Sequence, residues 1–106
     1  MTEANIIKYI GLKRLDELDR AKLVKVMDSE YEKIHRALNN ITNLVVNVKI
    51  YDDSGNKDRR KKYSIHVRVE SPTKQFASED FDWDIAKAAH KSVNNILSEV
   101  QHAFKK

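Results

Sequence analysis

Two stretches of strictly alternating side chains constrain the fold of this chain more than any other feature. In residues 44–51, and again in residues 63–70, every second side chain is apolar and most of those between are polar or charged. Alternation with a period of two is typical of antiparallel strands that bury one face and expose the other. Residues 52–62 open with turn-forming residues and end in a basic run. The two stretches therefore predict a hairpin with a long tip.

Spacings of three and four residues predict a helix on each side of this hairpin. The first helix is expected to start at an N-cap, Asp19, and to stop at Asn39-Asn40. The second is expected to span about Asp84 to Phe104, with aspartates near its N-terminus, where the helix dipole favours negative charge. The apolar stripe of the first helix consists of Leu23, Val26, Met27, Tyr31, Ile34 and Leu38.

Two shorter segments complete the expected sheet. Ile6 to Ile10 form a first strand that ends at Gly11, and Lys74 to Ser78 form a short fourth strand after Pro72, while residues 12–18 fit either a helical turn or an extended link. The fold class is therefore α+β in the order β-α-β-β-β-α. It has one mostly antiparallel four-stranded sheet with two helices packed on one face, similar to a double-stranded-RNA-binding domain. With two glycines, one proline and no repeat or linker, residues 1–106 are expected to form one domain.

Most kinds of chemistry find no support in the sequence. Without cysteine, the chain has no disulfide, no thiolate nucleophile and no cysteine-based metal site. Its four histidines form no H-x-x-x-H or H-E-x-x-H pattern, and there is no P-loop, nucleophile elbow or dinucleotide fingerprint. Asp80-x-Asp82-x-Asp84 lacks the glycine and glutamate of a calcium loop, so these acids are interpreted as helix caps. We therefore expect no enzyme, no catalytic or metal-binding residues, no cofactor and no small-molecule substrate.

The N-terminal residues do not have the pattern of a signal peptide, because Lys8 interrupts the apolar pair Ile6-Ile7. No stretch reaches the roughly 18 apolar residues that a membrane span needs. We therefore expect a soluble, cytoplasmic protein with no membrane partner. The net charge of +4 is a mild surplus of cations, so the positions of the charges carry more information than their sum.

The sheet face opposite the expected core is the candidate binding surface. That face is expected to carry Asn47, Lys49, Ser64, His66 and Arg68, and the hairpin tip adds Lys57, Arg59, Arg60, Lys61 and Lys62. Hydrogen-bonding groups and cations on an open face, next to a cationic arm, suit the phosphate backbone of RNA. The alternative is a solvated strand face with a charged loop that discourages edge pairing.

Four further positions each have a functional and a structural interpretation. Lys87 and Lys91 lie one turn apart on the second helix and could grip adjacent phosphates, or they could be ordinary solvent-facing charges. His66 could stack on a base or bind phosphate. Trp83, just before the second helix, is expected to be a hydrophobic anchor that fixes the entry of the helix, in preference to a stacking residue.

Three segments carry a family resemblance: the first helix leading directly into residues 44–49, the third strand at 65–69, and Phe76-Ala77-Ser78 leading through acids into residues 84–89. Together they resemble the ribosome hibernation-promoting factors, also called ribosome-associated translation inhibitors. The resemblance covers nearly the whole chain, by pattern more than by any single motif. It implies binding to the small ribosomal subunit and its rRNA near the decoding region, and silencing of translation in resting or stressed cells. It places Lys49, Arg68, Lys87 and Lys91 on elements that the family turns toward rRNA.

The chain departs from the family pattern at two places. Residues 12–18 are longer than expected between the first strand and the helix, and the basic hairpin tip is particular to this sequence. No C-terminal extension follows the second helix, so the dimerising tail of the longer family members is not expected. We expect a monomer that does not pair whole ribosomes.

Two alternative functions remain. A double-stranded-RNA-binding module shares most of this element order, but such modules open their second helix with lysines, where this chain has Asp82, Asp84 and Lys87. A protein-interaction domain without an RNA role would use the first helix or a sheet edge. Salt separates these possibilities, because roughly six phosphate contacts would lower affinity about a thousandfold between 50 and 200 mM salt.

Overall fold

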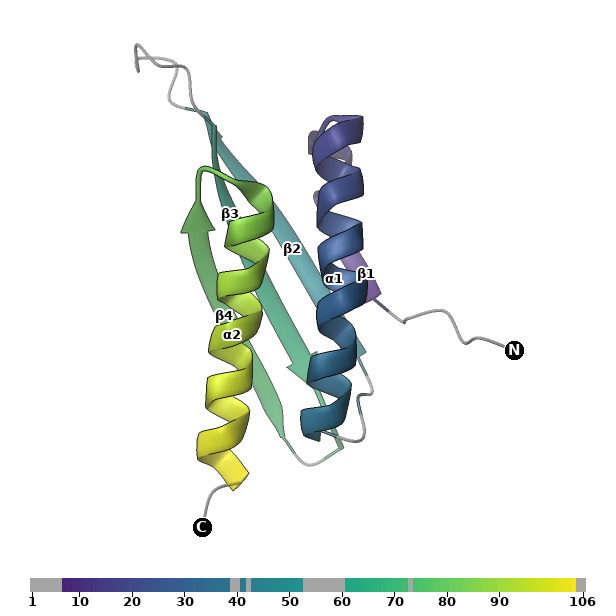
Figure 1. The fold of residues 1–106 in the computed structure, drawn as a ribbon, viewed down its shortest axis with the longest axis vertical. Coiled ribbons are helices and arrows are strands. Elements are labelled where there is room, and N and C mark those ends of the chain that lie inside the picture. Colours follow the sequence, from purple (N-terminus) through teal and green to yellow (C-terminus); the bar gives the residue numbers. More distant parts are fainter. Residues whose placement is uncertain (1–6, 39–40, 42, 53–60, 73, 105–106) are drawn as a thin grey trace, which may run out of the picture.

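The structure of the protein is a computed structural model, which describes residues 7–38, 41, 43–52, 61–72 and 74–104. The predicted order of elements is confirmed (Figure 1). The elements are β1 (Ile7–Ile10), a 3-10 turn η1 (Leu12–Arg14), α1 (Glu17–Leu38), β2 (Asn43–Asp52), β3 (Lys61–Glu70), β4 (Gln75–Asp82) and α2 (Ile85–Phe104).

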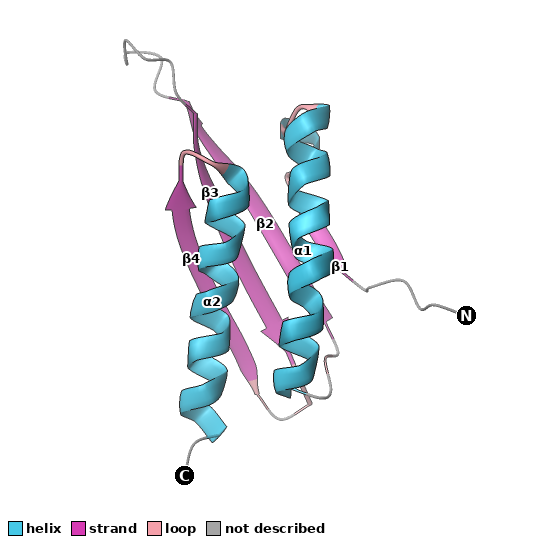
Figure 2. Ribbon diagram, in the orientation of Figure 1, coloured by secondary structure: helices cyan, strands magenta, loops and turns pink. Residues whose placement is uncertain are grey.

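The four strands form a mixed sheet in the order β1-β2-β3-β4. β2 pairs with β3 and β3 with β4 in antiparallel fashion, which confirms the predicted hairpin. β1 instead runs parallel to β2, because α1 connects them and returns the chain to the same end of the sheet. Both helices cover the same face of the sheet, and no helix of the described residues lies on the other face (Figures 1 and 2).

The core lies between this sheet and the two helices. The predicted stripe of α1 packs there, with Leu23, Met27 and Ile34 fully inaccessible and Val26 and Tyr31 partly buried. α2 contributes a stripe of small and branched side chains from Ile85 to Val100, which includes Ala88 and Ala89. The sheet supplies every second residue of the hairpin strands, namely Leu44, Val46, Val48, Tyr63, Ile65, Val67 and Val69. The alternation in the sequence therefore identified the buried face correctly.

The beginning of α1 differs from the prediction. The helix begins at Glu17, and Asp16 caps it, with its Oδ1 accepting a hydrogen bond of 2.8 Å from the Asp19 N–H. Asp19 is therefore inside the first turn and is not the N-cap. Residues 12–18, which fitted two interpretations, contain η1 and this first turn. Gly11 precedes η1 with a φ of 87°, and a Cβ there would overlap the carbonyl oxygen of Val48. The predicted stop at Asn39-Asn40 lies outside the described residues.

The fourth strand is longer than predicted, since β4 runs from Gln75 to Asp82 and not from Lys74 to Ser78. Of its eight residues only Phe76 is buried, because β4 lies at the edge of the sheet. Apolar alternation could not reveal a strand whose inward positions Ser78, Asp80 and Asp82 are polar.

Of the three aspartates interpreted as caps, Asp84 is the N-cap of α2, whereas Asp80 lies within β4 and accepts a hydrogen bond from the Phe81 N–H. Asp84 Oδ1 accepts hydrogen bonds from the N–H groups of Ala86 at 2.9 Å and Lys87 at 3.4 Å. Asp82 Oδ1 in turn accepts one from the Asp84 N–H at 3.0 Å. No group of three or more metal-ligating side chains occurs among the described residues. Within the same residues, neither helix is long and apolar enough to cross a membrane.

Candidate nucleic-acid interface

The open sheet face is assembled by the strand register. Three residue pairs on this face lie directly opposite each other: Val45 with Arg68, Asn47 with His66, and Lys49 with Ser64. β4 continues the same rows with Ala77 beside Arg68, Glu79 beside His66 and Phe81 beside Ser64. The register therefore brings together the predicted residues Asn47, Lys49, Ser64, His66 and Arg68 on one face. We call this surface the sheet face.

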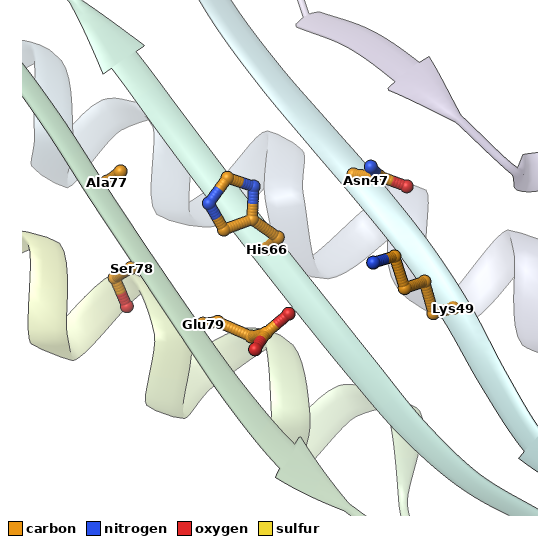
Figure 3. Close-up of a pocket in the computed structure, with 6 residues that line it drawn as sticks. All are labelled: Asn47, Lys49, His66, Ala77, Ser78 and Glu79. Carbon is orange, nitrogen blue, oxygen red and sulfur yellow. The ribbon is translucent and has the colours of Figure 1, made fainter.

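A shallow hollow of about 550 Å³ lies on the sheet face. Figure 3 shows His66 in its middle, with Asn47 and Lys49 on one side and Glu79 on the other. An amide, an ammonium group and an imidazole can donate hydrogen bonds to phosphate oxygens or base edges, and the carboxylate can accept from exocyclic amino groups. The residues that line the hollow are Asn47, Lys49, His66, Ala77, Ser78 and Glu79.

Not every predicted residue of the sheet face is available to a ligand. The Arg68 Nε lies 3.4 Å from Glu70 Oε1, so this guanidinium already has an anionic neighbour at the surface. The distance is that of an ion pair, and Arg68 Nε makes no hydrogen bond with a described residue. Ser64 was predicted to be exposed, yet its residue is 1% exposed because longer side chains flank it on the same face.

At the hairpin end of the sheet face, three exposed aromatic residues lie near Lys62. Tyr51 is directly opposite Lys62 in the register, and Phe81 and Trp83 follow from the end of β4. Trp83, which was expected to be a hydrophobic anchor at the start of α2, is 49% exposed, so about half of its surface is open to a ligand. Sequence analysis did not single out Tyr51 and Phe81. Alternation from Lys49 to Tyr51 could have identified Tyr51, whereas Phe81 lies beyond the predicted end of the fourth strand.

The predicted cations of α2 belong to a different surface. The Lys91 Nζ lies 2.9 Å from Asp82 Oδ2 and donates a hydrogen bond of 3.3 Å to the Phe81 carbonyl oxygen. The contact with the Asp82 carboxylate is a hydrogen bond from the charged ammonium group, and it raises the pKa of Lys91. The same bond, together with the Asp84 N–H, lowers the pKa of Asp82. A phosphate at Lys91 would therefore compete with Asp82, while Lys87, one turn earlier, is exposed.

The hairpin cations divide in the same way. Lys62 belongs to the sheet face, whereas Lys61 precedes the buried Tyr63 by two residues, so it points toward the helix side. Arg59 and Arg60, and Lys57 with them, lie outside the described residues. The structure thus places Lys49, Lys62, His66 and Arg68 on one face and Lys87 and Lys91 on the outside of α2.

Comparison with solved structures identifies the fold. The ribosomal subunit interface protein from Coxiella burnetii matches with a TM-score of 0.65 and 15% identity, over 94% of this chain and 98% of that chain. The N-terminal domain of Thermus thermophilus Protein Y matches with a TM-score of 0.61 and 19% identity, over 94% of this chain and 99% of that chain. The chain shares their fold. The resemblance to the hibernation-promoting factors is thus confirmed at the level of structure. No family model and no curated protein sequence matches the chain.

Proposed function

We propose that this protein is a cytoplasmic, ribosome-associated factor that binds small-subunit rRNA near the decoding region and silences translation in resting or stressed cells. The observation that carries the proposal is the structural match over nearly the full length of both chains to a protein named as a ribosomal subunit interface protein. The match to the Protein Y domain covers the same share of this chain and supports the same proposal.

The proposed mechanism is occupation of a site, without chemistry. On the sheet face, Lys49 and Lys62 would contact phosphates, and Asn47 and His66 would donate hydrogen bonds from the hollow between them. Arg59 and Arg60 would add phosphate contacts from the segment before β3, and Lys61 would add one from the helix side of that strand. Arg68 would join the sheet-face contact on exchange of Glu70 for phosphate. Lys87 would contact a second stretch of backbone, and Lys91, which is paired with Asp82, would join it only on exchange of Asp82 for phosphate. A folded domain held this way across the mRNA and tRNA path would block initiation as a monomer.

Sedimentation tests the proposal directly. In a sucrose gradient of cell lysate, the protein should travel with small subunits or whole ribosomes at low salt and move to the top at high salt, because phosphate contacts release counterions. Added to a translation reaction, it should reduce initiation. A protein that stays at the top of the gradient at every salt concentration would contradict the proposal.

Charge reversal on the sheet face supplies the matched comparison. A Lys49→Glu, Arg68→Glu double variant should lose ribosome binding, since each change adds repulsion where a phosphate contact is proposed. The corresponding double change Lys22→Glu, Lys25→Glu, at exposed positions of α1, should sediment as the unmodified protein does. Equal loss in both proteins would mean that net charge, and not this face, governs the association.

The alternative of a double-stranded-RNA-binding module has weaker support. Such modules use lysines at the start of the second helix to clamp phosphates across a groove. Here Asp84 caps that helix, and Lys91 is held by Asp82. Binding to duplex RNA that matches the affinity for ribosomes would favour this alternative, and salt-insensitive binding to a ribosomal protein would favour a protein-interaction domain.

A further inference from the structure

The hairpin end of the sheet face carries a cluster of rings that the proposed phosphate contacts do not explain. Tyr51 is 49% exposed, Phe81 39% and Trp83 49%. The Tyr51 and Phe81 ring centroids lie 6.4 Å apart at an interplanar angle of 48°. The Lys62 Nζ lies 4.9 Å from the Phe81 centroid and 6.0 Å from that of Trp83, within the range of cation–π attraction. We call these four residues the aromatic cluster.

Exposed rings are concentrated in this one place. Among the described residues, only five large apolar side chains are exposed, and the three aromatic ones all belong to the cluster. The other two, Ile10 and Leu18, are aliphatic and lie on β1 and α1. Leaving three rings in water forgoes the burial that would stabilise the fold, so the cluster is a candidate binding surface.

The charges around the rings favour a nucleic acid over a protein as the occupant. The cores of protein interfaces are enriched in aromatic residues and arginine but depleted in lysine, whereas the cation within this cluster is Lys62 and Lys49 lies nearby. Of the three aspartates that alternate with Phe81 and Trp83 in the sequence, Asp82 is already paired with Lys91 at 2.9 Å, Asp80 accepts a hydrogen bond from the Phe81 N–H, and Asp84 caps α2. Exposed rings on a sheet, with lysines beside them, form the surface on which unpaired bases stack.

The cluster also adjoins the hollow of the sheet face. Lys49 lines the hollow and shares a register row with Ser64 and Phe81. The Ser64 hydroxyl is buried in this row and makes no hydrogen bond with any described residue. A strand whose base rests on the rings can thus place its neighbouring nucleotide over Asn47, His66 and Glu79.

We propose that Tyr51, Phe81 and Trp83 form a stacking platform for an unpaired base of single-stranded RNA, with Lys62 binding the phosphate next to that base. The inference deepens the proposed function, on which it rests, because it specifies that part of the bound RNA is unpaired. The stacked base supplies affinity that salt does not screen, and the lysines supply affinity that salt does screen.

Trp83 makes the platform directly measurable, because it is the single tryptophan of the chain. A short oligoadenylate should quench Trp83 fluorescence in a saturable way. An abasic ribose–phosphate oligomer of equal length and charge should bind more weakly and leave the emission unchanged. If both oligomers bind equally well and neither quenches, binding is electrostatic only and the platform is overturned.

Two substitutions at Trp83 separate stacking from simple apolar contact. With a labelled oligoadenylate, Trp83→Leu should weaken binding about tenfold because it keeps apolar bulk but removes the ring, while Trp83→Phe should keep most of the affinity. Leu18→Ala, at an exposed apolar residue elsewhere, should change nothing. If Trp83→Leu binds as well as Trp83→Phe, the cluster is an apolar contact surface for a protein partner and the platform is overturned.

The gradient experiment keeps this inference distinct from the proposed function. Ribosome association without quenching by any oligonucleotide would leave the proposed function standing and overturn the platform. Base-dependent quenching in a protein that never sediments with ribosomes would support the platform and overturn the proposed function. Circular dichroism of each variant confirms that a loss of binding is not a loss of fold.

Discussion

A single hydroxyl joins the sheet to the start of α1. The buried Tyr63 of β3 donates a hydrogen bond of 2.6 Å to Asp19 Oδ2 in the first turn of the helix. Burial raises the pKa of Tyr63 far above its usual value of 10.0, and the hydrogen bond to Asp19 raises it further. The neutral phenol is therefore the form that the folded state favours.

Tyr63→Phe should lower the free energy of unfolding by about 1–2 kcal/mol at neutral pH, because it removes a hydrogen bond to a carboxylate. Folding raises the pKa of Tyr63, so the contribution of the neutral phenol to the free energy of unfolding is complete below about pH 10. That contribution is lost as the pH rises toward the pKa of Tyr63 in the folded state. Above pH 10 the advantage of the unmodified protein should shrink by about 1.4 kcal/mol per pH unit. Urea unfolding at a series of pH values measures this difference.

Tyr31→Phe is the control for this measurement, because it removes a tyrosine hydroxyl from α1, the helix that carries Asp19. A stability difference between Tyr63→Phe and the unmodified protein that stays constant up to pH 11 would contradict the assigned hydrogen bond. Tyr9, whose pKa burial raises to about 12, adds a loss of the same sign in both proteins and cancels in the comparison.

Predictions for single residues succeeded where alternation determined the face on which a side chain lies. They failed where neighbouring side chains determined how exposed the residue is. Lys49 and His66 lie on the predicted face, because strand parity fixes direction. Ser64 lies there too but is buried, since its longer neighbours on the face cover it, and no pattern in its own strand reveals that. Trp83 was expected to anchor the start of the second helix because it precedes that helix, but its position beyond β4 leaves it half exposed.

At the scale of elements, the two helices are joined by one buried acid. Glu30 of α1 is 2% exposed, and its Oε1 lies 2.8 Å from His90 Nδ1 of α2 and 3.4 Å from Lys33 Nζ. Its Oε2 makes no hydrogen bond with any described residue. Burying a carboxylate with one unsatisfied oxygen costs free energy of folding. The interactions of Glu30 with His90 and Lys33 therefore have to offset most of that cost.

The two sides of this contact should respond unequally to mutation. His90→Ala removes the half-exposed partner and leaves the buried carboxylate with Lys33 alone, so it should cost about 1–3 kcal/mol. Glu30→Leu replaces the acid by an apolar side chain of similar volume and frees His90 to water, so it should be nearly neutral or stabilising. The double variant should resemble Glu30→Leu, and urea unfolding measures all three. A larger loss in Glu30→Leu than in His90→Ala would contradict this account.

Element boundaries were predictable only where apolar side chains mark them. The stripes of α1 and α2 and the alternation of β2 and β3 gave four elements at nearly their observed extent, because each of them buries one face in the core. β4 extends four residues further than expected through polar positions, since backbone pairing to β3 holds it and burial does not. The Glu30–His90 contact joins positions 60 residues apart, and no local spacing announces it.

At the scale of the whole molecule, the two-layer arrangement separates the cations into two surfaces. Both helices occupy one side of the sheet (Figure 1). The strand register places Lys49 and Lys62 on the opposite face, so they point away from the layer that carries Lys87 and Lys91. One flat stretch of RNA backbone cannot lie against both surfaces at once. The family resemblance grouped Lys49 with Lys87 and Lys91 as residues turned toward rRNA, because a linear sequence carries no information on which layer faces the partner.

Salt dependence can determine which surface binds phosphate. Each phosphate contact contributes about 0.7–0.9 to the slope of log affinity against log salt concentration. Lys49→Gln should therefore weaken binding to purified small subunits and lower this slope by about one such step. Lys25→Gln, on the exposed side of α1, is the control for the loss of one charge.

The α2 surface needs a variant that does not leave an acid unpaired. Lys91→Gln alone would expose the Asp82 carboxylate, so the double change Lys91→Gln, Asp82→Asn removes the pair and keeps the net charge at +4. Because Lys91 is already bound to Asp82, this variant should keep both the affinity and the slope. If the slope of log affinity against log salt concentration falls in the double variant and not in Lys49→Gln, the phosphate contacts lie on α2 and not on the sheet face. A fall in both would mean that the RNA wraps around the edge at β4, the strand that separates the two surfaces.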